Sequence, residues 1–134
     1  MTAIIKQVII IRKDLKLRRG KEISQGAHSA MKFLCDKIRL VLDMGDPTNY
    51  IGITLTEIER KWIQGLFTKI CLQVNSEQEL LNIHHQAQEA GLTSCLIQDA
   101  GQTEFHGVPT NTCLAIGPDT AERIDPITSK LSLY

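Results

Sequence analysis

Two charged residues, Lys21 and Asp99, occupy positions at which side chains commonly take part in binding or catalysis. Lys21 follows Gly20 at the predicted start of a helix, where unpaired backbone N–H groups and the helix dipole favour an anion. Asp99 ends a predicted strand ahead of Gly101, and strand ends in α/β folds often carry functional groups. The simpler alternatives are a solvated lysine at a helix start and a carboxylate that caps the turn before Gly101.

The helix predicted over Lys21–Lys37 carries a polar stripe. With about 100° per residue, Gln25, His28 and Lys32 lie within about 40° of Lys21. Gln25 is a neutral donor and acceptor that suits a carbonyl or hydroxyl group. His28 either lines a site or is a helix histidine satisfied by a backbone carbonyl, and no Ser or Cys nucleophile stands in a recognisable context beside it. The opposite side of the helix is expected to pack through Ile23, Ala27, Ala30, Met31 and Leu34.

Charge is distributed unevenly along the chain. Residues 1–40 contain ten Lys or Arg and three Asp or Glu, a net charge of +7, and the remaining residues carry −7. Such asymmetry favours a polyanionic partner for the basic part, although the charges could also simply solvate two helical surfaces. The residues expected to contact phosphates are Lys13, Lys16, Arg18, Arg19 and Lys32.

The four cysteines do not form a metal or disulfide pattern. Cys35, Cys71, Cys95 and Cys113 show neither a C-x-x-C clip nor a Cys/His ligand spacing. Three of them fall in predicted strands, so we expect buried, reduced thiols and a reducing compartment. The apolar run at the N-terminus is too short for a signal peptide, and no stretch is long enough to cross a membrane.

Strands and helices alternate along the chain. We predict strands at Gln7–Arg12, Thr68–Val74, Ser94–Gln98 and Thr112–Gly117, with Pro118 ending the last one. Besides Lys21–Lys37, we predict helices from about Leu55 to Gly65, over Asn75–Gly91 and near Ala121–Ile124. This order predicts an α/β fold: one domain over residues 1–134, a three-layer α/β/α sandwich around a mixed sheet of about four strands.

Several residues are expected to fix the ends of these elements. The second helix starts with a capping box of Thr54 and Glu57, or of Thr56 and Glu59. The third has Ser76 and Glu79 in the same spacing, and Gly91 at its end. A turn is predicted over residues 43–47, and Trp62 is expected to anchor the second helix rather than to stack on a base.

An ordered set of motifs resembles the second-type peptidyl-tRNA hydrolases of archaea, eukaryotes and some bacteria. Each motif is weak alone, but together they follow the order of that family over essentially the whole chain. They are RKDLK at residues 12–16, GKEISQGAHSA at 20–30, Trp62 and Gly65, Glu79-Leu80, AGL at 90–92, IQDAGQT at 97–103, LAIGP at 114–118, and Ile124-Asp125.

The resemblance implies an activity and a set of catalytic residues. The family cleaves the ester between a peptide, or an N-blocked amino acid, and the 3′ end of tRNA, without metal or cofactor. The carried-over catalytic residues are Lys21, Asp99, Gln25, His28, Thr103 and Thr112. Asp99 is expected to orient the attacking water, because pairing with Lys21 lowers the pKa of the carboxyl and makes it a poor base. The resemblance further implies tRNA bound at the basic N-terminal segment, a homodimer, and a cytoplasmic protein that is not associated with a membrane.

Several segments depart from the family pattern, and the stretch from Arg39 to about Lys61 is longer than usual. Gly65–Lys69 lacks a usual Lys-Lys pair, Pro109–Thr112 replaces a Gly-Thr-x-Thr turn, and Ser129 replaces a glycine. These changes motivate two alternatives: a non-catalytic RNA- or protein-binding module on the same scaffold, and a hydrolase for another acylated tRNA or a small ester. The joint presence of Lys21, Asp99 and the other carried-over residues weighs against the binding module.

Overall fold

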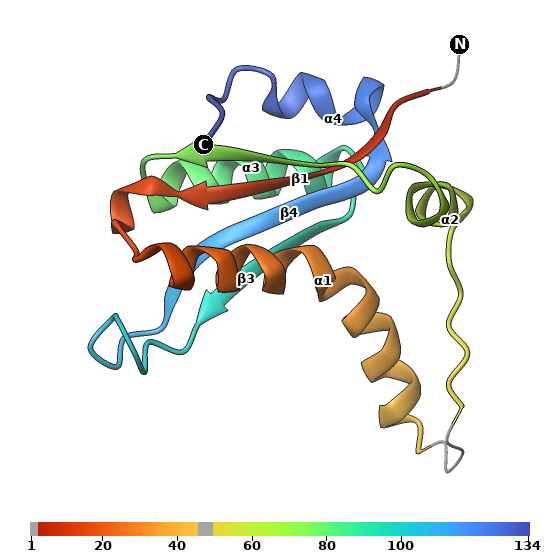
Figure 1. Cartoon of the computed structure of the whole chain (residues 1–134), viewed down its shortest axis with the longest axis horizontal. Coiled ribbons are helices and arrows are strands. Elements are labelled where there is room, and N and C mark those ends of the chain that lie inside the picture. The colour runs from red at the N-terminus through yellow and green to blue at the C-terminus, as the bar shows by residue number, and fades with distance from the viewer. Residues whose placement is uncertain (1–2, 46–49) are drawn as a thin grey trace.

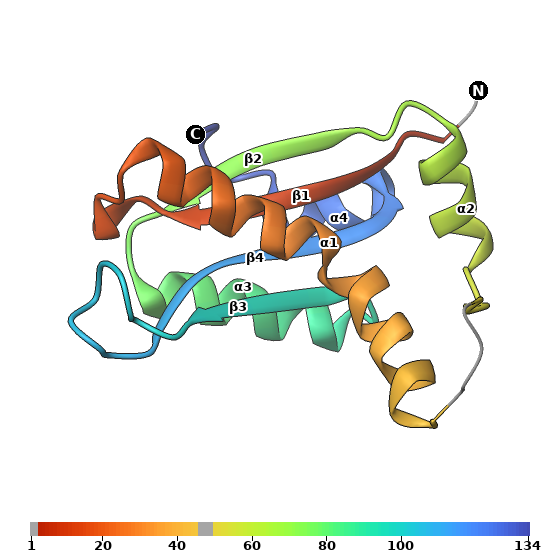
Figure 2. The same cartoon turned by 60° about the horizontal axis from the view of Figure 1, so that its bottom comes forward.

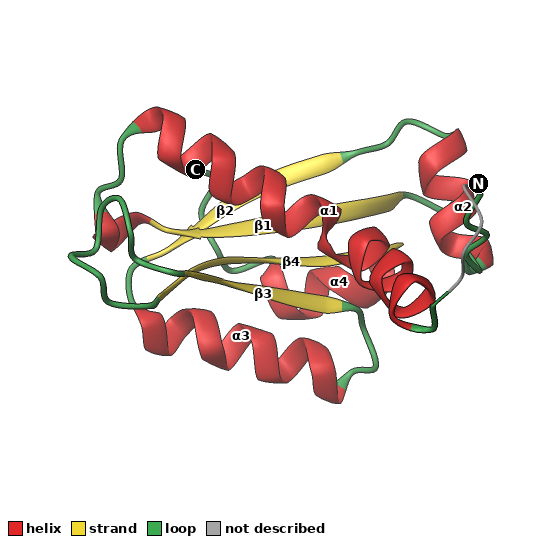
Figure 3. Ribbon diagram, turned by 90° about the horizontal axis from the view of Figure 1, so that it is seen from below, coloured by secondary structure: helices red, strands yellow, loops and turns green. Residues whose placement is uncertain are grey.

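The computed structural model describes residues 3–45 and 50–134 and arranges them in three layers (Figure 1). Helix α1 covers one face of a four-stranded sheet, and helices α3 and α4 cover the other (Figures 1 and 3). The predicted three-layer sandwich with a four-stranded mixed sheet is therefore confirmed. The elements are β1 (Ile5–Arg12), a single-turn helix η1 (Lys13–Leu15), α1 (Arg19–Asp43), α2 (Glu57–Gln64), β2 (Lys69–Val74), α3 (Glu77–Glu89), β3 (Ser94–Asp99), β4 (Thr110–Thr120) and α4 (Ala121–Thr128).

The sheet has the strand order β2-β1-β4-β3, which places β1 and β4 in its centre (Figure 2). β1 pairs with β2 in parallel and with β4 antiparallel, and β4 pairs antiparallel with β3. Because side chains alternate along a strand, Val8 and Ile10 pack in the core beneath α3 and α4, whereas Ile9 and Ile11 face α1. β1 is thus buried on both faces, as its apolar sequence predicts.

Helix α1 packs against the sheet through a side that only partly matches the predicted one, since Ala30 and Leu34 pack against buried residues as expected. Its buried residues are Gln25, Ser29 and Phe33, spaced four apart on one stripe. Ile23 and Met31 are instead 66% and 59% exposed. The side-chain amide of Gln25 donates a hydrogen bond to Asp99 and accepts one from Thr112. Gln25 can therefore be buried without loss of hydrogen bonds.

Strand β4 continues beyond Pro118, which was expected to end it. The pairing of β4 with β1 shifts register between Lys6 and Val8, so that Lys6 faces Asp119 and Val8 faces Ile116. Pro118 falls in this irregularity, where no backbone N–H is required for the hydrogen bonds between the strands.

The cysteine predictions are partly confirmed. Cys95 and Cys113 are buried as predicted, but the prediction for Cys71 is wrong, because this cysteine is exposed on β2. Burial raises the pKa of both buried thiols to about 11.

The predicted helix caps are present at the start of α2 and at both ends of α3. Thr56 and Glu59 form the complete capping box of α2, and the alternative with Thr54 is not used. Ser76 caps α3 by accepting from the N–H of Glu79. Gly91 follows the end of α3 with φ +74, the left-handed conformation that suits glycine at a helix terminus.

Helix α1 runs six residues past its predicted end at Lys37. Residues 46 and 47 of the predicted turn lie outside the described residues.

Trp62 anchors α2 to the sheet, as predicted. It is 2% exposed, packs edge-on against Phe33 of α1, and donates from Nε1 to the carbonyl oxygen of Thr68 at 2.8 Å. We expect Trp62→Ala to lower the free energy of unfolding by about 3–5 kcal/mol, because it leaves a cavity between α1 and α2. Urea denaturation followed by far-UV circular dichroism measures this. Leu66→Ala is the control, since Leu66 is 95% exposed, and an equal loss in both variants would contradict the anchoring role.

Candidate active site

Four segments bring polar side chains together at one end of the sheet. Lys21 stands in the first turn of α1, Asp99 ends β3, Thr103 lies in the loop that follows, and Thr112 stands near the start of β4. Lys21 Nζ lies 2.8 Å from Asp99 Oδ2 and 2.9 Å from Thr103 Oγ1. The side chains of Lys21 and Asp99 are only 15% and 14% exposed, so the ion pair is largely shielded from water.

Asp99 accepts hydrogen bonds on both carboxylate oxygens. Oδ2 accepts from Lys21 and from Gln25 Nε2 at 3.0 Å, and Oδ1 accepts from the backbone N–H of Gly101 at 2.8 Å. The hydrogen bond from Lys21, aided by those from Gly101 and Gln25, lowers the pKa of the Asp99 carboxyl, and partial burial opposes this effect. The carboxylate is therefore ionised, and it is a weak base, as the sequence predicted.

Gln25 and Thr112 lie beneath the ion pair and are buried. Gln25 is 1% exposed and Thr112 is fully buried, and Thr112 Oγ1 donates to Gln25 Oε1 at 2.5 Å. With its oxygen occupied by Thr112, the Gln25 amide is fixed with its nitrogen toward Asp99. These two residues thus hold the carboxylate in place from below.

His28 and Lys32 lie further along α1 and do not contact this cluster of hydrogen bonds. His28 is exposed, and Lys32 pairs with Asp36 one turn onward at 2.9 Å. Together with Cys35 they line a separate groove between α1 and β3. The predicted polar stripe therefore runs from the Lys21–Asp99 pair into a second cavity.

Four basic residues lie before α1 and at its first position, and one of them, Arg18, lines the cavity at Lys21. Lys13, Lys16 and Arg19 are exposed, and Arg18 Nε donates to Glu104 Oε1 at 2.7 Å. Glu104 was not singled out from the sequence, because it lies 86 residues from Arg18 and only the fold of the loop after β3 brings them together.

A cavity of about 530 Å³ opens directly above Lys21. It is lined by Arg18, Gly20, Lys21, Ser24, Thr103 and Glu104. Its volume lies within the usual range for small-ligand sites, about 300–1,000 Å³. In the part of the chain that the structure describes, no group of three or more His, Cys, Asp and Glu side chains is arranged to hold a metal ion.

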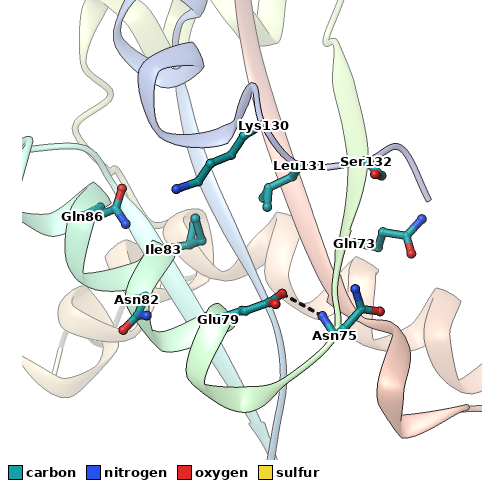
Figure 4. Close-up of a pocket in the computed structure, with 9 residues that line it drawn as sticks. All are labelled: Gln73, Asn75, Glu79, Asn82, Ile83, Gln86, Lys130, Leu131 and Ser132. Carbon is teal, nitrogen blue, oxygen red and sulfur yellow. Dashed lines mark hydrogen bonds between the residues drawn. The ribbon is translucent and has the colours of Figure 1, made fainter.

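A further hollow of about 430 Å³ lies between α3 and the C-terminal segment (Figure 4). Four of its nine lining residues carry amide side chains, and Lys130 and Glu79 stand on opposite walls. The Glu79 carboxylate accepts from the backbone N–H of Asn75 at 3.0 Å and acts in the cap of α3. The hollow lies on the α3 face of the sheet, away from Lys21 and Asp99, and it contains no comparable pairing of a cation with a carboxylate.

Comparison with known proteins shows a family that the chain matches over nearly its whole length. The family model described as peptidyl-tRNA hydrolase PTH2 matches residues 5–134. A peptidyl-tRNA hydrolase of Haloquadratum walsbyi is 36% identical over 130 residues, covering 97% of this chain and 100% of the relative. One from Methanopyrus kandleri is 39% identical over 129 residues, covering 96% and 97%. A probable peptidyl-tRNA hydrolase 2 of Dictyostelium discoideum is 33% identical over 135 residues, covering 96% of this chain and 54% of that protein.

The coupling between Lys21 and Asp99 can be measured directly. We expect the Asp99 carboxyl to protonate below its ordinary pH range, and Lys21→Met to raise its pKa, because the principal hydrogen bond is lost. Because the folded-state pKa is lowered, the stabilisation is present at neutral pH and is lost as pH falls through that lowered pKa. NMR titration of the labelled carboxyl tests this. The exposed Lys13→Met is the control, and an unchanged Asp99 pKa in Lys21→Met would contradict the assignment.

Proposed function

The chain belongs to the peptidyl-tRNA hydrolase PTH2 family, and on that premise we propose that it hydrolyses the ester between a peptide and the 3′ end of tRNA at Lys21 and Asp99. The observation that carries this proposal is the convergence of Lys21, Asp99, Gln25, Thr103 and Thr112 on one hydrogen-bonded cluster. The reaction uses these side chains without a metal ion or cofactor.

Lys21 and Asp99 have complementary parts in ester cleavage. The Lys21 ammonium has three hydrogens and directs two of them to Asp99 and Thr103, so the third can stabilise the developing oxyanion. The Asp99 carboxylate offers about four lone-pair positions and uses three, which leaves one to accept from a water molecule. Asp99 therefore orients the attacking water, in keeping with the lowered pKa of its carboxyl.

The other predicted catalytic residues fall into two groups, one buried and one exposed. Gln25 and Thr112 are buried and position Asp99, whereas Thr103 is exposed and contacts substrate directly. Thr103 accepts from Lys21, so its own hydroxyl hydrogen is free to bind the ribose or the ester carbonyl. His28 is exposed one turn beyond Gln25 and lines the groove into which the acyl group extends.

The tRNA approaches across the basic segment that precedes α1. Lys13, Lys16, Arg18 and Arg19 contact phosphates without reading sequence, as an enzyme that accepts many tRNAs requires, and Lys32 adds charge further along α1. No helix within residues 3–45 and 50–134 is long and apolar enough to cross a membrane. The tRNA substrate and the four free cysteines support a cytoplasmic location.

The segments that depart from the family pattern leave the cluster complete. Thr112 keeps its hydrogen bond to Gln25 despite the altered turn at Pro109–Thr112. In Gly65–Lys69, the Phe67 ring packs at a tilt against Trp62, and Lys69 Nζ at the start of β2 lies over the Phe67 ring at 3.1 Å. None of these residues contacts Lys21 or Asp99. These contacts favour a working hydrolase over a non-catalytic binding module.

Hydrolysis of N-acetylaminoacyl-tRNA by the purified protein tests the proposal. We expect release of the acyl group without added metal, and a fall in kcat of about 10²–10³-fold in Lys21→Ala and Asp99→Ala, because each loses the charge that acts on the reacting atoms. Release is measured by acid precipitation of labelled acyl-tRNA. Comparison with free aminoacyl-tRNA and a small ester separates the other substrate classes.

The matched control is Lys37→Ala, which removes an α1 lysine whose partner is Glu59 and not Asp99. It should keep full kcat. A folded wild type that binds RNA without turnover would reject the enzyme and favour the binding module.

We also propose that the protein is a homodimer. Support comes from an apolar hollow of about 720 Å³ between α1 and β2, on the part of the sheet that α1 leaves open. Ile23, Met31 and Phe67 are exposed around it, and such a contiguous apolar surface favours a partner. Arg19 and Glu22 stand at its rim with opposite charges, which suits a self-complementary contact about a two-fold axis.

Light scattering of a charge substitution tests the dimer. Ile23→Asp should halve the mass of the particle, because it places a carboxylate in the apolar contact. Leu40→Asp is the control, since Leu40 is 67% exposed on the same helix but outside the hollow, and it should stay dimeric. A wild type that is monomeric at high micromolar concentration rejects the proposal.

A further inference from the structure

The outer edge of β3 lies open beside the active site. Within residues 3–45 and 50–134, β3 pairs only with β4, and its other edge has no strand against it. A groove of about 440 Å³ runs between this strand and α1. It is lined on α1 by His28, Lys32 and Cys35, and on β3 by Leu96, Ile97 and Gln98.

Both walls of the groove lead toward residues of the catalytic cluster. Gln98 is followed directly by Asp99, and His28 lies one turn beyond Gln25 on the same helix. The polar stripe of α1 that begins at Lys21 therefore becomes one wall of the groove. Figure 2 shows α1 crossing the sheet obliquely, with β3 at its edge.

We propose that the peptide part of the substrate binds in this groove as an added strand, parallel to β3 and hydrogen-bonded to its open edge. This rests on the proposed hydrolysis of peptidyl-tRNA. The ester carbonyl belongs to the last residue of the peptide and must lie at Lys21 and Asp99. The preceding residues then extend back toward Ser94, which gives the peptide the direction of β3.

Strand addition lets the enzyme bind peptides of any sequence, as hydrolysis of peptidyl-tRNA requires. An open strand edge presents backbone N–H and C=O groups, which every peptide can pair. β3 has six residues, so at about 3.3 Å per residue the edge accommodates about five residues of peptide.

The chemistry of the groove fits a peptide better than a nucleic acid strand. Two cations line the groove on α1: Lys32, which pairs with Asp36 at 2.9 Å, and Arg39 one turn beyond Asp36. The β3 wall includes the aliphatic side chain of Ile97, which packs on the α1 face of the sheet, whereas the Leu96 side chain packs on the opposite face. Lys32 and Arg39 against Asp36 leave the lining a net charge of +1, less than that of the basic segment with Lys13, Lys16, Arg18 and Arg19. A phosphate backbone is therefore attracted more strongly to that segment, whereas an uncharged extended peptide meets apolar surface and free backbone groups in the groove.

Substrates of graded length and altered backbone test the proposal with the wild-type protein. A tetrapeptidyl-tRNA should have a KM about tenfold below that of N-acetylaminoacyl-tRNA, because only the longer acyl group reaches the edge of β3. N-methylation of the residues whose N–H points to β3 should raise KM about fivefold per lost hydrogen bond, and methylation of the alternate residues should not. Side-chain changes should have little effect. Equal KM values at all lengths, or no alternation, would overturn the proposal.

A substitution in the groove provides an independent test. Cys35→Trp fills the groove from α1 and should bring the KM of tetrapeptidyl-tRNA close to that of N-acetylaminoacyl-tRNA. Leu40→Trp carries the same bulk on an exposed position of α1 outside the groove and should keep the tenfold difference. Circular dichroism confirms that both variants fold, and the N-methylation series on wild type decides the matter if Cys35→Trp does not.

Binding of a non-hydrolysable probe separates this proposal from the catalytic one. A fluorescent tetrapeptide joined by an amide to 3′-amino-adenosine should bind with the same dependence on N-methylation, measured by anisotropy. Turnover of N-acetylaminoacyl-tRNA without alternation in probe binding would reject the groove and keep the hydrolase. Alternating probe binding without turnover would reject the hydrolase and keep the groove.

Discussion

The ion pair between Lys21 and Asp99 is the interaction on which the rest of the site depends. It joins the start of α1 to the end of β3 across 78 residues of sequence, and it is largely shielded from water. A shielded carboxylate is costly unless it is paired and hydrogen-bonded. Asp99 meets that condition with donors from Lys21, Gln25 and Gly101, so its charge, orientation and low pKa have one common cause.

This pairing requires α1 to lie close to the sheet on a partly polar surface. Small side chains on both sides allow the approach: Gly26 and Ser29 on the helix, and Cys113 and Ala115 on β4. The hydrogen bonds of Gln25 and Ser29 are satisfied at the interface. A satisfied polar network permits fewer arrangements than an apolar contact, so it specifies how the helix is placed. The larger apolar core lies on the other face, beneath α3 and α4, and carries most of the hydrophobic burial.

Within the described residues, the edge of the sheet at β2 is covered and the edge at β3 is open. The C-terminal segment covers the outer edge of β2, where Gln73 N–H donates to the carbonyl of Ser132 and Tyr134 N–H to that of Cys71. The edge of β3 lacks such a cover within the described residues, although open edges favour unwanted pairing. β3 ends at Asp99, so its open edge begins at the catalytic cluster. In the proposed complex, the acyl chain of the substrate extends from the cluster along this edge.

The sequence by itself determined the fold class, the order of the elements and the capping residues of α3, narrowed the cap of α2 to two pairs, and singled out Lys21 and Asp99 as residues of one site. These follow from local periodicity, capping chemistry and an ordered set of motifs. Tertiary structure alone decided which side of α1 is buried, because Gln25 can be inside only where Asp99 and Thr112 meet its amide. It likewise decided that β4 passes through Pro118 at a register shift, that Glu104 meets Arg18, and that the polar stripe continues into a groove beside β3. Each of these depends on contacts between residues far apart in the chain, which a local pattern cannot encode.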